Sequence, residues 1–290
     1  MTPIIDQVKA YLAAAQAGEA EISEETIEWF GNQCKEILRG QFEPKEKKEW
    51  GIRMSAIGKP LCQQQMEKAG VESQGGDPFL TMRFLFGDMI EAASIAIMKG
   101  AGIGIQEFQQ GTSYTFKDGG EIDGTLDVII DDKVYDIKSA SPFAFKHKFA
   151  SSKGFSALAD DDPFGYVSQG YLYSEGVGKP FGGWIVVDKS SGHWTVLETP
   201  LIDSGWRKKA ITDAEANYTA LKDDAPFQRC FDPVEETFNK KATGNYYLDT
   251  TCSYCSFKHE CYKDTTLEYL PQPKSKAANP RRFWYVGSVT

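Results

Sequence analysis

The sequence has few histidines, no long apolar run and no excess of positive charge. Only 3 of its 290 residues are histidine, and neither HExxH nor GxSxG occurs, so these hydrolase centres are not expected. No apolar stretch approaches the roughly 18 residues that a membrane span needs, so no membrane association is expected. The start, MTPIIDQVKAYLAAAQAGEA, contains early acids and no basic region. It does not resemble a signal peptide, and a cytoplasmic location is expected.

The net charge of the chain argues against one class of nucleic-acid-binding protein and leaves another possible. A net charge of −9 and a pI of about 5.0 argue against a protein that coats nucleic acid non-specifically. An enzyme that acts on nucleic acid needs only a local basic track, and acids that hold metal ions lower the total charge. No GxxxxGK(S/T) motif occurs, so the chain carries no helicase motor of its own.

Hydrophobic periodicity predicts an α/β fold in which helices flank a mixed sheet. Helices are expected at 4–15, 24–38, 163–175 and 203–222, and a further helix from Asp77-Pro78 to about Lys99. Strands are expected within 100–138 and at 184–187 and 193–197. From Cys230 onward the sequence predicts irregular structure.

We therefore expect three segments that pack as one unit. They are a helical N-terminal region at 1–76, a core at 77–225, and a cysteine-containing segment with a polar tail at 226–290.

The most informative stretch is GTLDVIIDDKVYDIKSAS, at 124–141. Two apolar runs flank Asp131-Asp132, which are good turn residues. A turn centred there pairs Ile130 with Lys133 and Asp127 with Asp136. Since strand side chains alternate faces, the hairpin gathers two carboxylates and the Lys138 ammonium on one face.

This group has the chemistry of phosphodiester hydrolysis. Two carboxylates at cross-strand distance repel unless a cation lies between them, and Mg²⁺ or Mn²⁺ suits oxygen ligands. A lysine beside such an ion can orient water or stabilise charge on a phosphate. The alternative is an exposed hairpin with scattered charges.

An Asp followed nine residues later by Asp-Ile-Lys resembles the signature of the PD-(D/E)XK nucleases. The wider pattern is similar to their RecB-like branch, which includes phage and prophage exonucleases. This resemblance implies a restriction-endonuclease-like mixed sheet. It implies catalytic roles for Asp127, Asp136, Lys138, Gln169 and Tyr173. It implies metal binding by Glu91, Asp127, Asp136 and the backbone carbonyl of Ile137.

Two flanking helices contribute to the resemblance. Gly87 and Glu91 match its first motif, and Gln169-x-x-x-Tyr173 matches its QxxxY motif. Each pair is spaced i and i+4, so its members share a helix face, and Gly87 is expected to let its helix approach the sheet. The alternatives are a solvated acid and a packing pair.

The acid of the second motif has a competitor in Asp123. Asp123 follows Gly120 with the spacing by which Asp127 follows Gly124. The turn geometry favours Asp127, because pairing Asp123 with Asp136 would centre the turn on Ile129-Ile130.

Cys252-x2-Cys255-x5-Cys261 gives three thiols within ten residues, which indicates a metal site. The fourth ligand must come from elsewhere: Cys62, Cys230 or, for zinc, His259.

The cysteine pattern resembles the iron–sulfur nucleases of CRISPR adaptation and the AddB-like nucleases. In these, an upstream cysteine joins three C-terminal ones to bind a 4Fe–4S cluster. The resemblance implies such a cluster on Cys62, Cys252, Cys255 and Cys261, with Cys230 as the alternative to Cys62 and Zn²⁺ as the alternative to iron. This chain departs from the pattern, since Pro60 stands where the upstream cysteine is usual.

After the hairpin, Lys146, Lys148 and Lys153 alternate with phenylalanines. Lysines bind phosphates and aromatic rings stack on unpaired bases, so DNA contact is expected; the alternative is a basic loop. The resemblance implies a metal-dependent DNA exonuclease of recombination or repair, beside a strand-annealing or single-strand-binding protein. The alternatives are a site-specific or structure-specific endonuclease and a non-catalytic DNA-binding module.

Overall fold

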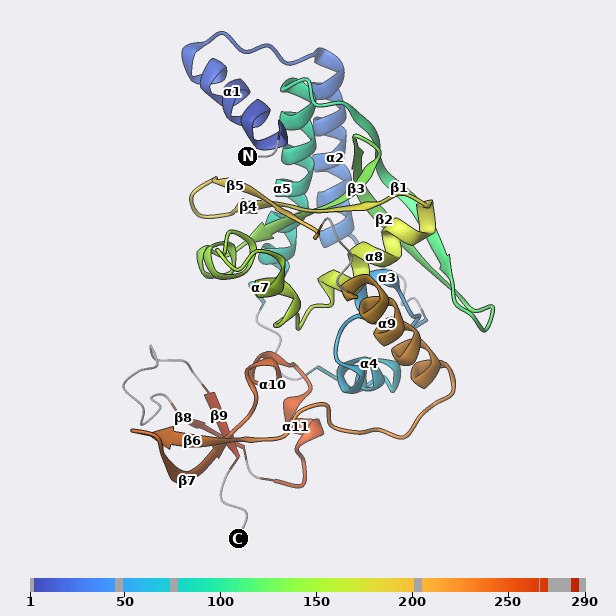
Figure 1. Ribbon diagram of the computed structural model, residues 1–290, viewed down its shortest axis with the longest axis vertical. Helices are drawn as coiled ribbons and strands as arrows, with labels where there is room; N and C mark the ends of the chain where they lie inside the picture. The colour runs from blue at the N-terminus through green and yellow to red at the C-terminus, as the bar shows by residue number, and fades with distance from the viewer. Residues whose placement is uncertain are drawn as a thin grey trace. The chain divides into compact units, whose positions relative to one another are not determined.

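The computed structural model describes residues 3–44, 49–73, 78–200, 205–265, 267–270 and 283–286 (Figure 1). The chain forms two compact units, one within Met1–Gly58 and Pro78–Tyr218 and one within Lys59–Asp77 and Thr219–Thr290. The second unit thus joins two stretches that are far apart in the sequence. The predicted division into segments at 76/77 and 225/226 stays a prediction. No helix of the described residues is long and apolar enough to cross a membrane.

The first unit is a mixed sheet flanked by helices. Its helical elements are α1 (Pro3–Ala17), α2 (Glu24–Phe42), α3 (Met54–Ile57), α5 (Leu80–Gly100), α6 (Pro142–Ala144), η1 (Phe145–Phe149), α7 (Phe155–Ala159), α8 (Tyr166–Val177) and the start of α9 (Trp206–Lys222). Its strands are β1 (Ile105–Thr115), β2 (Glu121–Ile130), β3 (Lys133–Ala140), β4 (Phe181–Asp188) and β5 (Trp194–Glu198). The predicted α/β fold with a helical N-terminal region is confirmed.

The sheet has the order β1-β2-β3-β4-β5. All neighbouring strands are antiparallel except β3 and β4, which are parallel and joined by a crossover that contains α8. All eight residues of β4, FGGWIVVD, are buried. This is the pattern of a strand covered on both faces.

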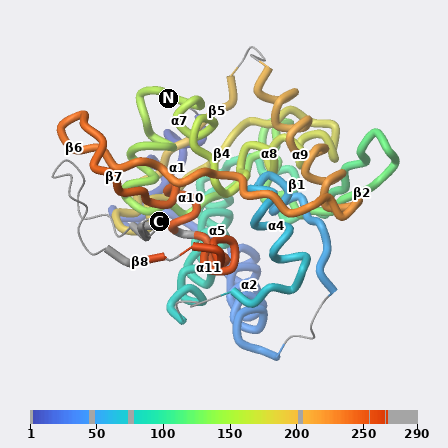
Figure 2. Tube along the Cα trace, turned by 90° about the horizontal axis from the view of Figure 1, so that it is seen from below, coloured from blue at the N-terminus to red at the C-terminus, as the bar shows by residue number. Residues whose placement is uncertain are grey.

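Two long helices lie side by side in both ribbon and tube views (Figures 1 and 2). The first, α2, begins where the Ser23 hydroxyl accepts a hydrogen bond from the Thr26 amide at 3.2 Å. Such a cap satisfies an amide that has no partner within the helix. The second, α5, begins at Leu80, and the predicted cap Asp77 lies outside the described residues.

The main core lies between the sheet and helices α1 and α5. Its buried residues come from both helices and from strands β2, β3 and β4, and they include Val8, Ile95, Met98, Val128 and Ile137. Burying each such side chain contributes about 1.5–3 kcal/mol. Because Ile137 points into this core, its neighbours on β3 point to the opposite face of the sheet.

The second unit contains α4 (Leu61–Lys68), α10 (Thr250–Tyr254) and α11 (Lys258–Cys261). It also has an antiparallel sheet of order β6-β7-β9-β8, formed by β6 (Val234–Phe238), β7 (Lys241–Tyr247), β8 (Leu267–Leu270) and β9 (Phe283–Val286). The prediction of irregular structure after Cys230 was therefore wrong. The β6–β7 hairpin buries little on either face, so it lacks the apolar alternation that marks a strand.

Candidate active site

The β2–β3 hairpin has the register predicted from the sequence. Ile130 is opposite Lys133, and Val128 is opposite Tyr135. The turn residues Asp131 and Asp132 both have positive φ, 49° and 61°, as a two-residue hairpin turn of type I′ requires.

Beyond Val128 the strands separate, and a side chain fills the place of a backbone hydrogen bond. Asp127 Oδ2 accepts a hydrogen bond of 2.6 Å from the Ile137 amide. This bond holds the Asp127 carboxylate between the strands, beside Asp136. The alternative acid, Asp123, is exposed and lies opposite Ser113 on β1.

Asp136 is the most buried acid of the group, with 1% of its surface exposed. Its Oδ1 accepts a hydrogen bond of 2.7 Å from Lys138 Nζ. Its Oδ2 is buried and has no hydrogen-bond donor among the described residues other than the Asp127 carboxyl, which hydrogen-bonds to Asp136 when it is protonated. A buried carboxylate oxygen without a partner is costly, so this atom marks a place for a cation or a proton.

Three carboxylates share the single positive charge of Lys138. Burial, then the Asp136 and Glu91 carboxylates, raises the pKa of Asp127 well above its ordinary value of 3.8. Burial also raises the pKa of Asp136 and of Glu91, while Lys138 opposes both shifts. Burial alone would lower the pKa of Lys138, but Asp136 and Asp127 raise it above the ordinary value. When all three carboxyls are ionised, the group therefore carries more negative charge than Lys138 balances, and burial opposes that ionisation.

Glu91 lies on α5, where it is half-buried, hydrogen-bonds to Gln109 and interacts electrostatically with Lys138 and Asp136. Gly87, one turn earlier, faces β3, and a Cβ added to it would lie 3.7 Å from Ser139 Oγ. That is ordinary van der Waals contact, so the approach of α5 to the sheet does not require a glycine at this position. The expectation that a small residue at this position lets the helix approach the sheet stays a prediction.

Helix α8 covers the opposite face of the sheet with one row of polar side chains. Gln169 Nε2 donates a buried hydrogen bond of 2.9 Å to the Tyr173 hydroxyl. Burial, with Asp136 and Asp127 adding to it, raises the pKa of Tyr173 to about 12. A Cβ on Gly124 would lie 2.5 Å from the Tyr173 ring. A glycine is therefore needed there for Tyr173 to reach the site.

Tyr166 belongs to the same row, and the sequence analysis missed it. It lies three residues before Gln169, which is the spacing of one helix face. Lys138 Nζ lies 5.4 Å from the centroid of its ring, within the range of a cation–π contact. The i−3 spacing from Gln169 was a signal for the shared helix face, but not for the approach of Lys138 to the ring.

The carboxylate group suits a divalent cation in its chemistry. Oxygen ligands, an excess of negative charge and an unpartnered buried oxygen are what Mg²⁺ or Mn²⁺ requires. Within the described ranges, no three His, Cys, Asp or Glu side chains already stand in a metal-binding arrangement. Glu91, Asp127 and Asp136 would therefore have to adjust their side chains to share one ion.

Five of the six cysteines lie in the second unit, and all six are free thiols. The Cys62 amide donates to Cys230 Sγ at 3.1 Å, so the two candidate fourth ligands contact each other. A hydrogen bond from the Cys62 side chain lowers the pKa of Cys230 to about 6. Burial raises the pKa of Cys252 to about 12. Cys261 interacts electrostatically with both Cys230 and Cys255.

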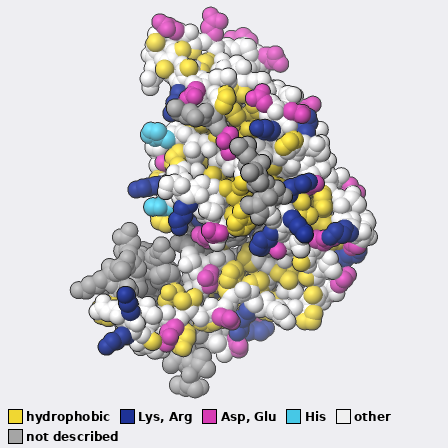
Figure 3. All heavy atoms as spheres, in the orientation of Figure 1, with side chains coloured by type: hydrophobic (Ala, Val, Ile, Leu, Met, Phe, Trp, Pro, Cys, Tyr) yellow, Lys and Arg dark blue, Asp and Glu magenta, His cyan; other side chains and the backbone are white. Residues whose placement is uncertain are grey.

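The three candidate DNA-binding lysines have different surroundings. Lys146 and Lys153 are exposed, whereas Lys148 forms an ion pair of 3.0 Å with Asp161. On the face shown in Figure 3, Lys and Arg side chains are interspersed with acidic ones.

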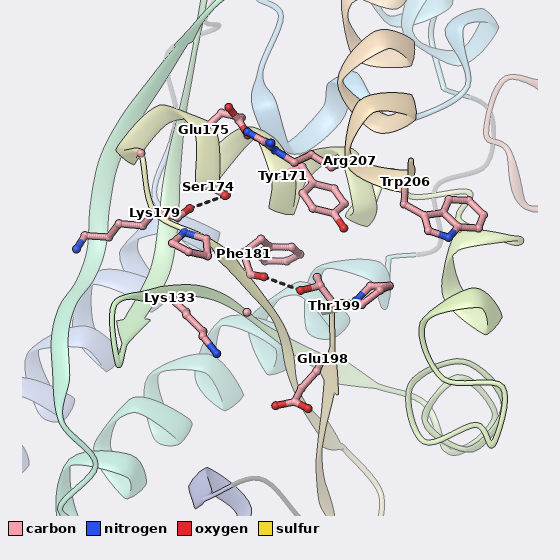
Figure 4. A pocket seen from close by; sticks show the side chains of 14 residues that line it. Lys133, Tyr171, Ser174, Glu175, Lys179, Phe181, Glu198, Thr199, Trp206 and Arg207 are labelled. Carbon is pink, nitrogen blue, oxygen red and sulfur yellow. Dashed lines mark hydrogen bonds and ion pairs between the residues drawn. The ribbon is translucent and has the colours of Figure 1, made fainter. Parts of the chain in front are cut away.

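A cavity of about 510 Å³ lies elsewhere in the first unit, between the end of α8, the β4–β5 hairpin and the start of α9 (Figure 4). None of the carboxylates described above lines it. Among the charged side chains that line it, Arg207 pairs with Glu175 and Lys179 pairs with Asp132. Lys133 and Glu198 also line it.

No family model matches this chain, and no curated protein matches it. The solved structure of SSO0001 is 16% identical and aligns over 81% of this chain and 97% of that chain, with a TM-score of 0.45. A structure from Eubacterium rectale named "Putative exonuclease" is 14% identical and aligns over 78% of this chain and 83% of that chain, with a TM-score of 0.35. At these TM-scores, neither likeness carries an argument about this chain.

Proposed function

We propose that the first unit is a metal-dependent deoxyribonuclease of the PD-(D/E)XK type, which hydrolyses phosphodiester bonds from DNA ends. The observation that carries the proposal is the surroundings of the Asp136 carboxylate. Its Oδ1 accepts a hydrogen bond from Lys138, and its buried Oδ2 is available to bind a cation. Asp127 and Glu91 add the further carboxylates that a divalent ion needs.

The roles of the residues follow from their chemistry. Glu91, Asp127, Asp136 and the Ile137 carbonyl would hold Mg²⁺ or Mn²⁺, which when bound supplies a Lewis acid and a water of lowered pKa. Lys138 keeps its positive charge at neutral pH and stabilises negative charge that develops on the phosphate. Gln169 and Tyr173 present an amide and a phenol that can orient DNA or water.

Action from DNA ends rests on the RecB-like sequence pattern and on the missing helicase motif. We place the enzyme in recombination or repair, in the cytoplasm, beside a strand-annealing or single-strand-binding protein. End-labelled linear DNA should be degraded with Mg²⁺ or Mn²⁺, while closed circles should resist. Efficient cutting of circles would identify an endonuclease, and DNA binding without cutting would identify a binding module.

The metal requirement has a matched pair of variants on one strand. Asp127→Ala should lose cleavage and Mn²⁺ binding, measured by electron paramagnetic resonance. Asp123→Ala, on the same strand but exposed, should retain both. Equal losses in the two variants, or full activity in EDTA, would remove the site from the proposal.

We also propose that the second unit holds a 4Fe–4S cluster on Cys252, Cys255, Cys261 and either Cys62 or Cys230. All five thiols belong to one unit, and thiolates suit both iron–sulfur clusters and Zn²⁺. Protein purified without oxygen should be brown. Cys62→Ser and Cys230→Ser will identify the fourth ligand, with Cys34→Ser as the control. A colourless protein that contains one zinc per chain would show that the site binds Zn²⁺ and not an iron–sulfur cluster.

A further inference from the structure

Phe164 is a large apolar side chain in the turn that leads into α8, and 55% of its surface is exposed. Its ring stacks on Tyr166, with ring centroids 5.4 Å apart and planes inclined by 24°. Tyr166 in turn lies under the Lys138 ammonium. A continuous series of contacts therefore joins an exposed aromatic ring to the lysine of the candidate active site.

The turn that carries Phe164 is held on both sides. The Asp162 carboxylate accepts hydrogen bonds from the amides of Tyr166, at 3.0 Å, and Val167, at 2.8 Å. Gly165 has a φ of +75°, and a Cβ on it would lie 2.4 Å from the backbone of Gly58. Single exposed apolar residues are common and need no explanation. Phe164 differs because its ring stacks on Tyr166 in a turn held by these contacts, while more than half of the residue stays exposed.

The neighbouring π-helical segment η1 brings positive charge to the same turn. Lys148 pairs with Asp161, three residues before Phe164. Phe149 contacts the Tyr166 ring, with centroids 6.4 Å apart. Lys146, on the same segment, is exposed and forms no ion pair with the described residues. A ring for a base and an amine for a phosphate thus occur on elements that contact each other.

We propose that Phe164 stacks on an unpaired nucleobase, and that the substrate is therefore single-stranded DNA or an unpaired strand end. A base within a duplex is already stacked on both faces, whereas a free base presents its π-face whatever its identity. Stacking on Phe164 fixes the strand relative to Tyr166 and hence to Lys138. This inference rests on the proposed nuclease function and names its substrate class.

The test couples a protein change to a DNA change. Binding of fluorescent single-stranded oligonucleotides is measured in EDTA, so that no cleavage occurs. Phe164→Ala should weaken binding by roughly 5- to 150-fold, the range known for loss of one base–aromatic stack. One abasic position along the oligonucleotide should weaken wild-type binding similarly, yet have little further effect on Phe164→Ala. Phe164→Trp should retain the affinity.

Two controls keep the result specific. Phe238→Ala removes a ring that is 41% exposed on β6, and it should leave the affinity unchanged. Phe164→Leu keeps the apolar volume of the side chain but has no π-face. It should bind single-stranded DNA as weakly as Phe164→Ala, which would show that the loss does not come from a disturbed turn. Blunt duplex binding should change little in either variant.

The inference is overturned if abasic positions weaken the wild type and Phe164→Ala equally, or if duplex binding falls as much as single-strand binding. These outcomes are separate from failure of the nuclease proposal. If the wild-type protein shows the coupling but cuts no DNA with Mg²⁺ or Mn²⁺, the stacking inference stands and the nuclease proposal is rejected. If the protein cuts DNA but shows no coupling, the nuclease proposal stands and the stacking inference is rejected.

Discussion

Lys138 Nζ lies 2.7 Å from one oxygen of Asp136, while the other oxygen of the same carboxylate is buried, with no donor among the described residues other than a protonated Asp127. The lysine alone therefore does not satisfy the acid. Removal of Lys138 would leave both oxygens of this buried carboxylate without a lysine partner, so it should destabilise the metal-free protein.

Lys138→Ala should lower turnover about 100- to 1,000-fold, because it removes a positive charge that stabilises the transition state. DNA affinity in Ca²⁺ or EDTA should change much less, which single-turnover kinetics and binding titrations will separate. Lys138→Arg keeps the charge and serves as the matched variant. If Lys138→Ala loses affinity and turnover in equal measure, Lys138 is a phosphate anchor.

Stability in the absence of metal should depend on the pH through Asp127. Its pKa is raised in the fold, so its contribution to stability is complete below the unfolded pKa and is lost as the pH rises through the folded pKa. In EDTA, the free energy of unfolding of the wild type relative to Asp127→Asn should thus fall as the pH rises above about 4.

Urea unfolding at a series of pH values measures this difference. Saturating Mn²⁺ should abolish the fall, because the ion compensates the ionised carboxylates and binds only the folded state. A wild type that gains stability over Asp127→Asn with rising pH in EDTA would contradict the assignment.

Gly124→Ala should displace Tyr173 from the site. The new methyl group would lie 2.5 Å from the ring and 2.9 Å from Met54 Sδ, so the packing must shift. We expect a loss of about 1–3 kcal/mol in the free energy of unfolding and a reduced turnover. Gly111→Ala on β1, where nothing lies within 4 Å, should affect neither. Equal thermal denaturation of the two variants would refute the contact.

Cys255→Ser should lower the melting temperature and remove the colour of protein purified without oxygen. A metal centre that joins Cys252 to Cys62 closes a long loop, whereas one that uses Cys230 closes a short one. Either restricts the unfolded chain, an effect of several kcal/mol for disulfides. Cleavage should fall only as far as folding does. A Cys255→Ser protein as stable as the wild type would reject a structural centre.

Local patterns in the sequence predicted the centre of the site well. The Asp131-Asp132 turn and the alternation of apolar residues fix the hairpin register, because a slip by one residue would turn every side chain to the wrong face. The helix pattern likewise predicted α8, on which Gln169 and Tyr173 share one face.

Features that depend on contacts between distant segments escaped prediction. Tyr166 matters because Lys138 of β3 lies over it, and no local pattern records that approach. The contact between Cys62 and Cys230 joins residues 168 positions apart. The β6–β7 hairpin buries few side chains, so its sequence shows no clear apolar alternation. Its turn has positive φ at Asn239 and Lys240, a pair that the sequence analysis did not recognise as a turn.

The strand that carries Asp136 and Lys138 pairs in parallel with β4, every residue of which is buried. The amide hydrogens of this strand pair should therefore exchange with solvent only when the whole unit unfolds. Helix α8 packs against the same strands, is itself largely buried, and belongs to no strand ladder. The floor of the site is thus the slowest part of the unit to open. Under the proposed function, we expect the motion that admits a DNA strand to occur outside the strand ladder, in elements such as the turn before α8.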